Sequence, residues 1–201
     1  MWYNLGETVR YWAKYYPNDI ALWVEGESFT WTAFNERTDE LAAGLEKIGI
    51  RLRDRVAILS DNCVEWCETV IAVLKIGGII VPLNPRLLAR ELEYLVENSG
   101  TRLIICDEAH RERANEVKAN LADVVVAQIG TPTFESLRVN GAKPAPVVLG
   151  ADTPAAIGYT SGTTGFPKGA TLSHEGIRCM GLGTAMMNGF NAATRTLTPV
   201  P

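Results

Sequence analysis

Short apolar runs alternate with longer segments of helical periodicity along most of this chain. Four of the runs are compact and rich in Val, Ile and Leu, as buried strands are, and they cover residues 55–59, 79–83, 103–106 and 124–129. The segments between them repeat apolar residues at spacings of three and four, as amphipathic helices do. Strands that alternate with helices form parallel sheets. We therefore predict an α/β fold with a mostly parallel sheet flanked by helices on both faces.

Capping residues predict where several helices begin. Thr30 can cap one helix, and Gly100 can end another that covers residues 90–99. Asn62 is followed by Glu65 three residues later, a capping-box spacing with Asn in the Ser/Thr place. The apolar face of the helix after Asn62 would then consist of Cys63, Trp66, Cys67, Val70, Ile71 and Leu74.

The first 16 residues are unusually aromatic for one helix. A single face would contain Leu5, Val9, Trp12 and Tyr16. Further aromatic residues lie outside that face, so the segment is either a broad buried helix or has a second contact, with another subunit in a homodimer or with a domain that is not part of these residues.

Composition narrows the class of protein. The chain has 201 residues and a net charge of −4, and no basic stripe is present, which argues against a nucleic-acid partner. The longest apolar stretch, residues 71–83, is broken by Lys and Gly and is too short for a membrane span. The N-terminus lacks the pattern of a signal peptide, so we expect a cytoplasmic location.

The cysteines and histidines do not form a metal motif. Cys63 and Cys67 are four residues apart, and no second pair completes a zinc-site pattern. We expect buried free thiols. His110 and His174 are far apart in the sequence, and each is predicted to open a helix.

Residues 139–154 are rich in Pro and Gly and are predicted to be a linker. The unit that follows, residues 155–190, contains the chain's most informative segment, Tyr159-Thr160-Ser161-Gly162-Thr163-Thr164-Gly165-Phe166-Pro167-Lys168-Gly169-Ala170. Glycines allow backbone N–H groups to approach an anion, hydroxyls add donors, and the lysine adds positive charge. A strand that leads into such a loop is typical of a phosphate site.

Two common nucleotide-binding patterns do not fit. Counted from Gly162, the Walker pattern requires Gly where Pro167 stands. A dinucleotide fingerprint would begin at Gly181, but Met186 takes the place of its third Gly.

The loop resembles the signature loop of the adenylate-forming, or AMP-binding, enzymes. Its continuation through His174 and the upstream segment 77–86 are similar to the acyl-CoA synthetase branch, which includes fatty-acid–CoA ligases. The resemblance covers residues 20–201 and implies the N-terminal portion of an adenylation domain, with the C-terminal domain absent. The chain departs from the family at Leu88, where a Ser or Thr usually caps a helix, so that helix would start elsewhere or be weaker.

The resemblance implies a two-step ligase. A carboxylate, which we expect to be a fatty acid, attacks ATP to give an acyl-adenylate and pyrophosphate, and coenzyme A then takes the acyl group as a thioester. The residues that match the family's ATP contacts are Thr160, Ser161, Gly162, Thr163, Thr164, Gly165 and Lys168. Thr164 and Lys168 would have the catalytic role of stabilising the leaving pyrophosphate. The glutamate that holds Mg²⁺ in the family has no match here.

Two alternatives stay open. The chain could belong to a peptide-synthetase adenylation domain that loads a carrier protein, or it could be a non-catalytic interaction module with this fold. Since adenine, ribose and Mg²⁺ are bound in the family by residues that follow this portion, we expect the 201 residues alone to be inactive.

Overall fold

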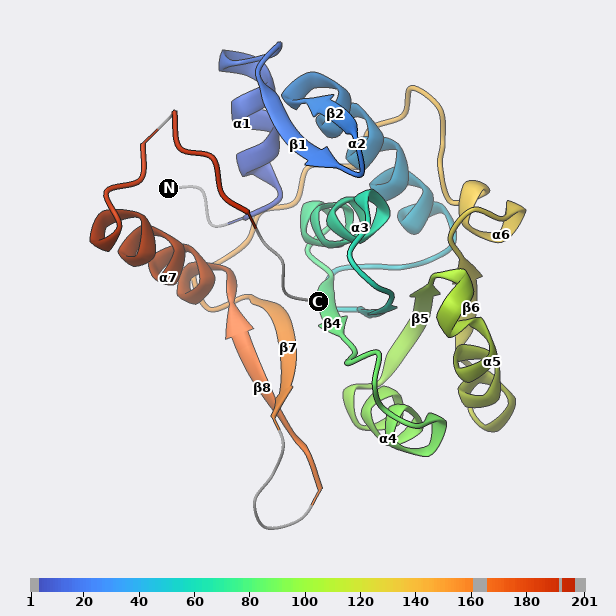
Figure 1. The fold of residues 1–201 in the computed structure, drawn as a ribbon. Coiled ribbons are helices and arrows are strands. Elements are labelled where there is room, and N and C mark those ends of the chain that lie inside the picture. The colour runs from blue at the N-terminus through green and yellow to red at the C-terminus, as the bar shows by residue number, and fades with distance from the viewer. Residues whose placement is uncertain (1–3, 161–165, 192, 198–201) are drawn as a thin grey trace.

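The computed structural model describes residues 4–160, 166–191 and 193–197. Its centre is a six-stranded sheet in the order β6-β5-β3-β4-β7-β8 (Figure 1). The strands are β3 (Arg55–Leu59), β4 (Ile79–Pro82), β5 (Thr101–Cys106), β6 (Val125–Gln128), β7 (Pro154–Thr160) and β8 (Lys168–Ser173). Neighbouring strands are parallel except β7 and β8, which form an antiparallel hairpin. The predicted mostly parallel sheet is confirmed.

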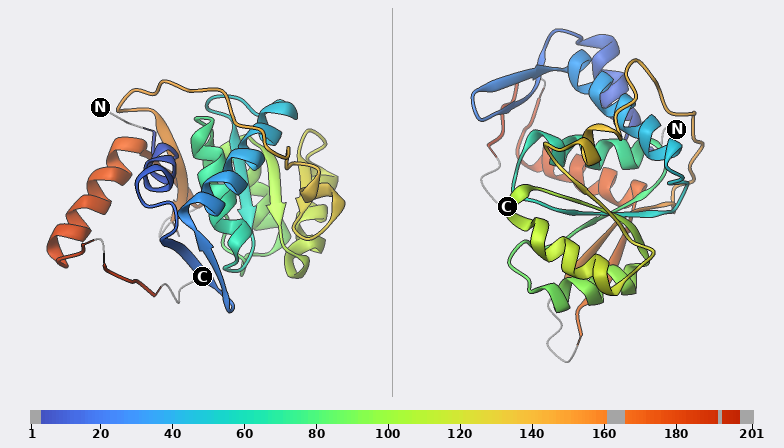
Figure 2. Two further views of the ribbon diagram at one scale, coloured as in Figure 1. Left: turned by 90° about the horizontal axis from the view of Figure 1, so that it is seen from above. Right: turned by 90° about the vertical axis from the view of Figure 1, so that its right-hand side faces the viewer.

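Helices cover both faces of the sheet, as the alternation predicts (Figure 2). On one side lie α2 (Trp31–Lys47) and α3 (Val64–Lys75), and on the other lie α4 (Ala89–Ser99) and α5 (Arg111–Asn120), which follows the short turn η1 (Glu108–His110). Successive residues of β3 point to opposite faces: Val56 and Ile58 join the core under α2 and α3, whereas Ala57 and Leu59 join the core under α4 and α5.

The remaining elements lie at the ends of this framework. Helix α1 (Glu7–Tyr15) packs on α2 beside the hairpin of β1 (Ile20–Val24) and β2 (Glu27–Thr30), and the short α6 (Pro132–Glu135) follows β6. Helix α7 (His174–Met187) follows β8, at the end of the sheet opposite α5 (Figure 1). None of the helices in the described part of the chain is long and apolar enough to span a bilayer.

The helix boundaries predicted from Thr30 and Gly100 are confirmed. The Thr30 hydroxyl accepts the backbone N–H of Ala33 at 3.2 Å, and Gly100 ends α4 with φ of 65°. The capping box at Asn62 is wrong, because the extended residue before α3 is Cys63, whose side chain makes no capping hydrogen bond.

Helix α4 starts directly after Leu88, so its start is not displaced by the missing cap. The Glu91 carboxylate accepts the backbone N–H of Leu88 at 2.8 Å. Glu91 thus supplies one half of a capping box, the half that does not need a hydroxyl at the first position.

The predicted apolar face of α3 is wrong for most of its length. Among its six residues only Leu74 is buried, while Trp66 and Val70 are half-buried against the core. The buried side of the helix consists instead of Glu68, Thr69, Ala72, Val73, Leu74 and Lys75. Glu68 and Lys75 are therefore buried at positions that the spacing of apolar residues assigns to the surface.

Ion pairs explain why those charges are buried. The Lys75 ammonium lies 2.6 Å from the Asp39 carboxylate of α2, and Glu68 pairs with Arg37 of α2 and with Arg138. A buried charge is tolerated where it is paired and hydrogen-bonded. These pairs turn α3 toward α2 and determine which of its faces enters the core.

The chain between α6 and β7 contains no helix or strand, but it packs along α2. The backbone N–H groups of Gly141 and Ala145 donate to the carboxylates of Glu40 and Glu46 at 2.8 and 3.1 Å. Leu137, near the start of this segment, lies directly against Gly44 of α2. A Cβ on Gly44 would lie 1.5 Å from the Leu137 carbonyl oxygen, so α2 needs glycine at this position. The division into a linker at 139–154 and a loop unit at 155–190 stays a prediction.

Candidate functional site

The β7–β8 hairpin brings the two ends of the signature loop together. In its register Thr160 is opposite Lys168, and Tyr159 is opposite Gly169. Thr160 and Lys168 are thus neighbours on adjacent strands. The other predicted contacts, Ser161, Gly162, Thr163, Thr164 and Gly165, lie outside the described residues.

The strand directions put this site at the edge of the sheet where the parallel strands end. Because β7 is parallel to β4, Thr160 lies at the carboxyl end of a parallel strand. Ligands of open α/β sheets bind outside the carboxyl ends of the strands. Thr160 and Lys168 are exposed there. No hydrogen bond or ion pair engages the Lys168 ammonium within residues 4–160, 166–191 and 193–197, so its charge is available to an anion.

Gly169 is required by the packing of its neighbour. A Cβ at this position would lie 2.9 Å from Cγ2 of Ile157 and 3.3 Å from the Tyr159 ring. The glycine therefore makes room for the tyrosine ring across the hairpin. Tyr159 extends to α4, where its hydroxyl donates to the Leu95 carbonyl oxygen at 3.1 Å and lies 2.7 Å from Asn98 Oδ1. Burial raises the pKa of Tyr159, so the hydroxyl stays a donor at neutral pH.

His174 opens α7, as predicted, and is completely buried. Its Nδ1 accepts the backbone N–H of Leu5 at 3.1 Å, which places the ring proton of the neutral form on Nε2. Nε2 has no hydrogen-bond partner among the described residues. Burial lowers the pKa of His174 to about 4.

The buried His174 predicts a loss of stability in acid. The unfolded chain, with a histidine pKa of about 6.5, binds more protons than the folded chain between about pH 6.5 and about pH 4, so stability falls as pH falls through this window. The variant His174→Asn retains an acceptor for Leu5 but does not titrate. Urea unfolding at about pH 7 and about pH 4.5 should show a smaller loss for His174→Asn than for the wild type. Equal losses in the two proteins would contradict this assignment.

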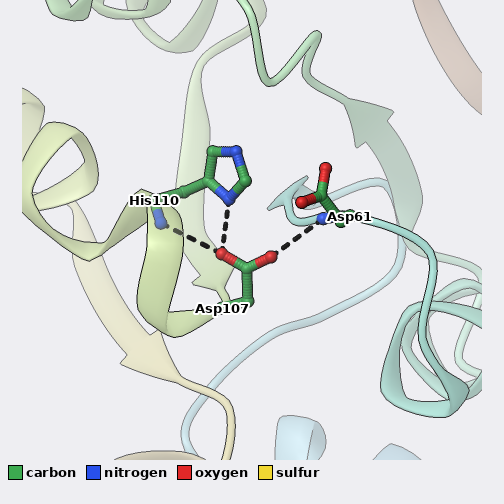
Figure 3. Close-up of side chains that lie close together, drawn as sticks. All are labelled: Asp61, Asp107 and His110. Atoms are coloured by element: carbon green, nitrogen blue, oxygen red, sulfur yellow. Dashed lines mark hydrogen bonds and ion pairs between the residues drawn. The ribbon is translucent and has the colours of Figure 1, made fainter.

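A second polar cluster joins three residues that the sequence gives no reason to connect: Asp61, Asp107 and His110 (Figure 3). The Asp107 carboxylate accepts the backbone N–H groups of Asp61 at 2.9 Å and His110 at 3.0 Å, and it pairs with His110 Nδ1. Burial by itself would raise the pKa of Asp107, but these hydrogen bonds lower it. Asp107 caps η1 and also connects the end of β5 to the loop after β3.

The cysteines in the described structure are free, and three are at least half-buried. Burial raises the pKa of Cys106 to about 11, which makes it a poor nucleophile. Cys179 is exposed on α7, so the expectation of burial is wrong for that residue.

An aromatic cavity of about 1050 Å³ lies between the β1–β2 hairpin, the start of α3 and residues 194–197. Trp12, Trp23, Trp31 and Trp66 line it, and Trp12 stacks on Trp31 with 5.8 Å between ring centroids. Tyr11 and Tyr15 are not among the lining residues and are 40% and 55% exposed. The homodimer contact stays a prediction.

Comparisons with known proteins agree with the signature loop. Residues 9–201 match the family described as AMP-binding enzyme. The chain is 31% identical over 174 residues to the fatty acid–[acyl-carrier-protein] ligase ScoC of Streptomyces coeruleorubidus, covering 86% of this chain and 33% of that protein. It is 32% identical over 204 residues to the long-chain-fatty-acid–CoA ligase FadD13 of Mycobacterium tuberculosis, covering 98% of this chain and 40% of that protein. Further relatives are described as a polyketide synthase–nonribosomal peptide synthetase of Aspergillus flavipes and as surfactin synthase subunit 2 of Bacillus subtilis.

Solved structures show the same fold. A Rhodopseudomonas palustris protein provisionally described as a long-chain-fatty-acid CoA ligase superposes with a TM-score of 0.87 at 28% identity, covering 94% of this chain and 49% of that one. ATP-bound MatB from the same organism superposes with a TM-score of 0.81 at 28% identity, covering 92% and 38%. The chain thus spans between about a third and a half of the length of these relatives.

Proposed function

The chain belongs to the AMP-binding enzyme family, and we propose that it is the pyrophosphate-holding part of an ATP-dependent acid–thiol ligase. The observation that carries the proposal is the β7–β8 hairpin. It sets Thr160 opposite Lys168, which is exposed and has no ion-pair partner among the residues that the structure describes. These two residues stand at the two ends of a segment that supplies further hydroxyls and glycines.

In the first step, a carboxylate oxygen of the acid attacks the α-phosphorus of ATP. A new oxygen–phosphorus bond forms, the bond between the α- and β-phosphates breaks, and its electron pair leaves with pyrophosphate. The acid is already ionised at neutral pH, so no general base is needed. We assign to Thr160, Thr164 and Lys168 the stabilisation of charge that develops on the leaving group. Gly162 and Gly165 would let the backbone N–H groups of Ser161 and Thr163 approach the phosphates.

In the second step, a thiol loses its proton and its sulfur attacks the acyl carbon. The carbon–sulfur bond forms, the bond between the acyl carbon and the phosphate oxygen breaks, and AMP leaves with that electron pair. We propose a fatty acid as the substrate and coenzyme A as the thiol, supported by the names of FadD13 and the Rhodopseudomonas palustris protein. A carrier-protein thiol is the second candidate, because ScoC, named as a fatty acid–[acyl-carrier-protein] ligase, and a polyketide synthase–nonribosomal peptide synthetase are also relatives. Either thiol attacks in the same way.

The proposal also includes Mg²⁺ bound to the ATP, to which we assign no residue of this chain, and a cytoplasmic location. We further infer that residues 1–201 alone do not complete a turnover. The lengths of the relatives support this inference, since the chain covers only 33% of ScoC and 40% of FadD13.

ATP–pyrophosphate exchange in the full-length protein tests the first step. With Mg²⁺ and a panel of fatty acids of increasing length, we expect exchange that depends on the acid. Mass spectrometry after addition of coenzyme A or an acyl carrier protein would identify the thiol. Absence of exchange with every acid would contradict the proposal, and exchange only with amino acids would favour the peptide-synthetase alternative.

A further inference from the structure

Helix α4 holds the exit of the signature loop through one side chain, Tyr94. The Tyr94 ring stacks on Phe166, with 5.0 Å between centroids and 30° between planes, and its hydroxyl donates to the Pro167 carbonyl oxygen at 3.3 Å. Phe166 is 75% exposed, and the stacking on Tyr94 connects its ring to α4. The Pro167 carbonyl belongs to the peptide bond that leads into Lys168. Tyr94 therefore fixes the backbone from which the lysine extends.

The same turn of α4 holds the entry of the loop. The Tyr159 hydroxyl contacts Leu95 and Asn98, which are one and four residues after Tyr94. Residues separated by four positions lie on one face of a helix, so both ends of the loop rest on a single surface. Tyr94 and Tyr159 also pack against the core beneath α4.

Helix α4 is itself firmly held. Its inner side buries Leu92, Leu95 and Val96, Gly100 ends it, and Glu91 supports its first turn. A side chain on this helix is therefore a fixed point in the structure.

We propose that Tyr94 is a positioning residue for the pyrophosphate-holding loop. By holding Phe166 and Pro167 before the nucleotide arrives, it keeps the backbone of Lys168 in place, which reduces the entropy lost when the lysine ammonium is positioned on phosphate. This inference rests on the proposed function for its ligand, whereas the support of the loop by α4 does not. Tyr94 does not touch the reacting atoms, and it acts through the placement of Lys168.

Two variants distinguish the contribution of the Tyr94 ring from that of its hydroxyl. Tyr94→Ala removes both contacts, and Tyr94→Phe retains the stacking but loses the hydrogen bond. Arg90→Ala, at an exposed position of the same helix, is the matched control. Hydrogen exchange of peptides covering residues 166–173 is measured without nucleotide in the full-length protein, together with the KM for ATP and the KM for the acid.

For Tyr94→Ala we expect about tenfold faster exchange in these peptides and an about tenfold higher KM for ATP, with the KM for the acid unchanged. Tyr94→Phe should show a smaller effect of about threefold, since stacking remains. A purely structural role would reduce the melting temperature without separating the two KM values. If Tyr94→Ala does not fold, Tyr94→Phe decides.

The inference would be overturned if Tyr94→Phe and a folded Tyr94→Ala both had the hydrogen-exchange rates and the KM for ATP of the wild type. If the wild type lacks ATP–pyrophosphate exchange, the proposed function fails. In that case the hydrogen-exchange comparison still decides whether Tyr94 holds the loop, so the two failures are distinguishable.

Discussion

Replacing Lys168 or Thr164 by alanine in the full-length protein should lower ATP–pyrophosphate exchange by about 100-fold for each change. Each variant removes one donor that we assign to the leaving pyrophosphate, and loss of one such contact typically lowers kcat on this scale. Lys168 is exposed next to Thr160 and is free of ion pairs within the described ranges, so its loss should not disturb the fold. The melting temperature should therefore stay close to that of the wild type.

Matched substitutions show whether the effect belongs to the loop. Thr171→Ala removes a hydroxyl from an exposed position of β8, and Lys143→Ala removes an exposed charge between α6 and β7. Both should exchange pyrophosphate at the wild-type rate. Unchanged rates in Lys168→Ala and Thr164→Ala would remove the support for a pyrophosphate-holding loop, and equal losses in the controls would indicate a general effect of surface substitution.

Replacing Lys75 by methionine should destabilise the protein by about 3–5 kcal/mol, because it leaves the carboxylate of Asp39 buried without its main partner. Lys75 is 1% exposed, and its ammonium donates to Asp39 at 2.6 Å, to Thr38 at 2.8 Å and to the Asn35 side-chain oxygen at 2.9 Å. Burial lowers the pKa of Lys75 to about 8, although Asp39 opposes the shift. Most of the lysine is therefore still charged at neutral pH.

Urea unfolding at neutral pH measures this change, and Lys47→Met at the exposed end of α2 is the control. The double variant Lys75→Met/Asp39→Leu removes both charges and should recover part of the loss, since no unpaired carboxylate remains. Arg10 also pairs with Asp39, at 3.2 Å, and limits the cost of the single change. A loss for Lys75→Met no larger than that for Lys47→Met would show that the buried pair does not stabilise the contact between α2 and α3.

Features that depend on neighbours in the sequence could be predicted from it. The alternation of apolar runs and helical periodicity predicted the mostly parallel sheet, because strand and helix periods are local properties of the chain. Thr30 and Gly100 predicted two helix boundaries, since capping and left-handed turns involve only a few residues. The segment around Gly162 and Lys168 predicted the family, because the signature is contiguous.

Only the tertiary structure decided which charged residues are buried. The apolar count put Glu68 and Lys75 of α3 outside the core, but α2 and Arg138 supply their partners from 31 to 70 residues away. In the same way, Tyr94 meets Pro167 across 73 residues, and Asp61 meets Asp107 across 46. Periodicity along one helix contains no information about such partners. The burial of a charge and the support of a loop depend on contacts between distant residues, which exist only once the sheet and its helices have assembled.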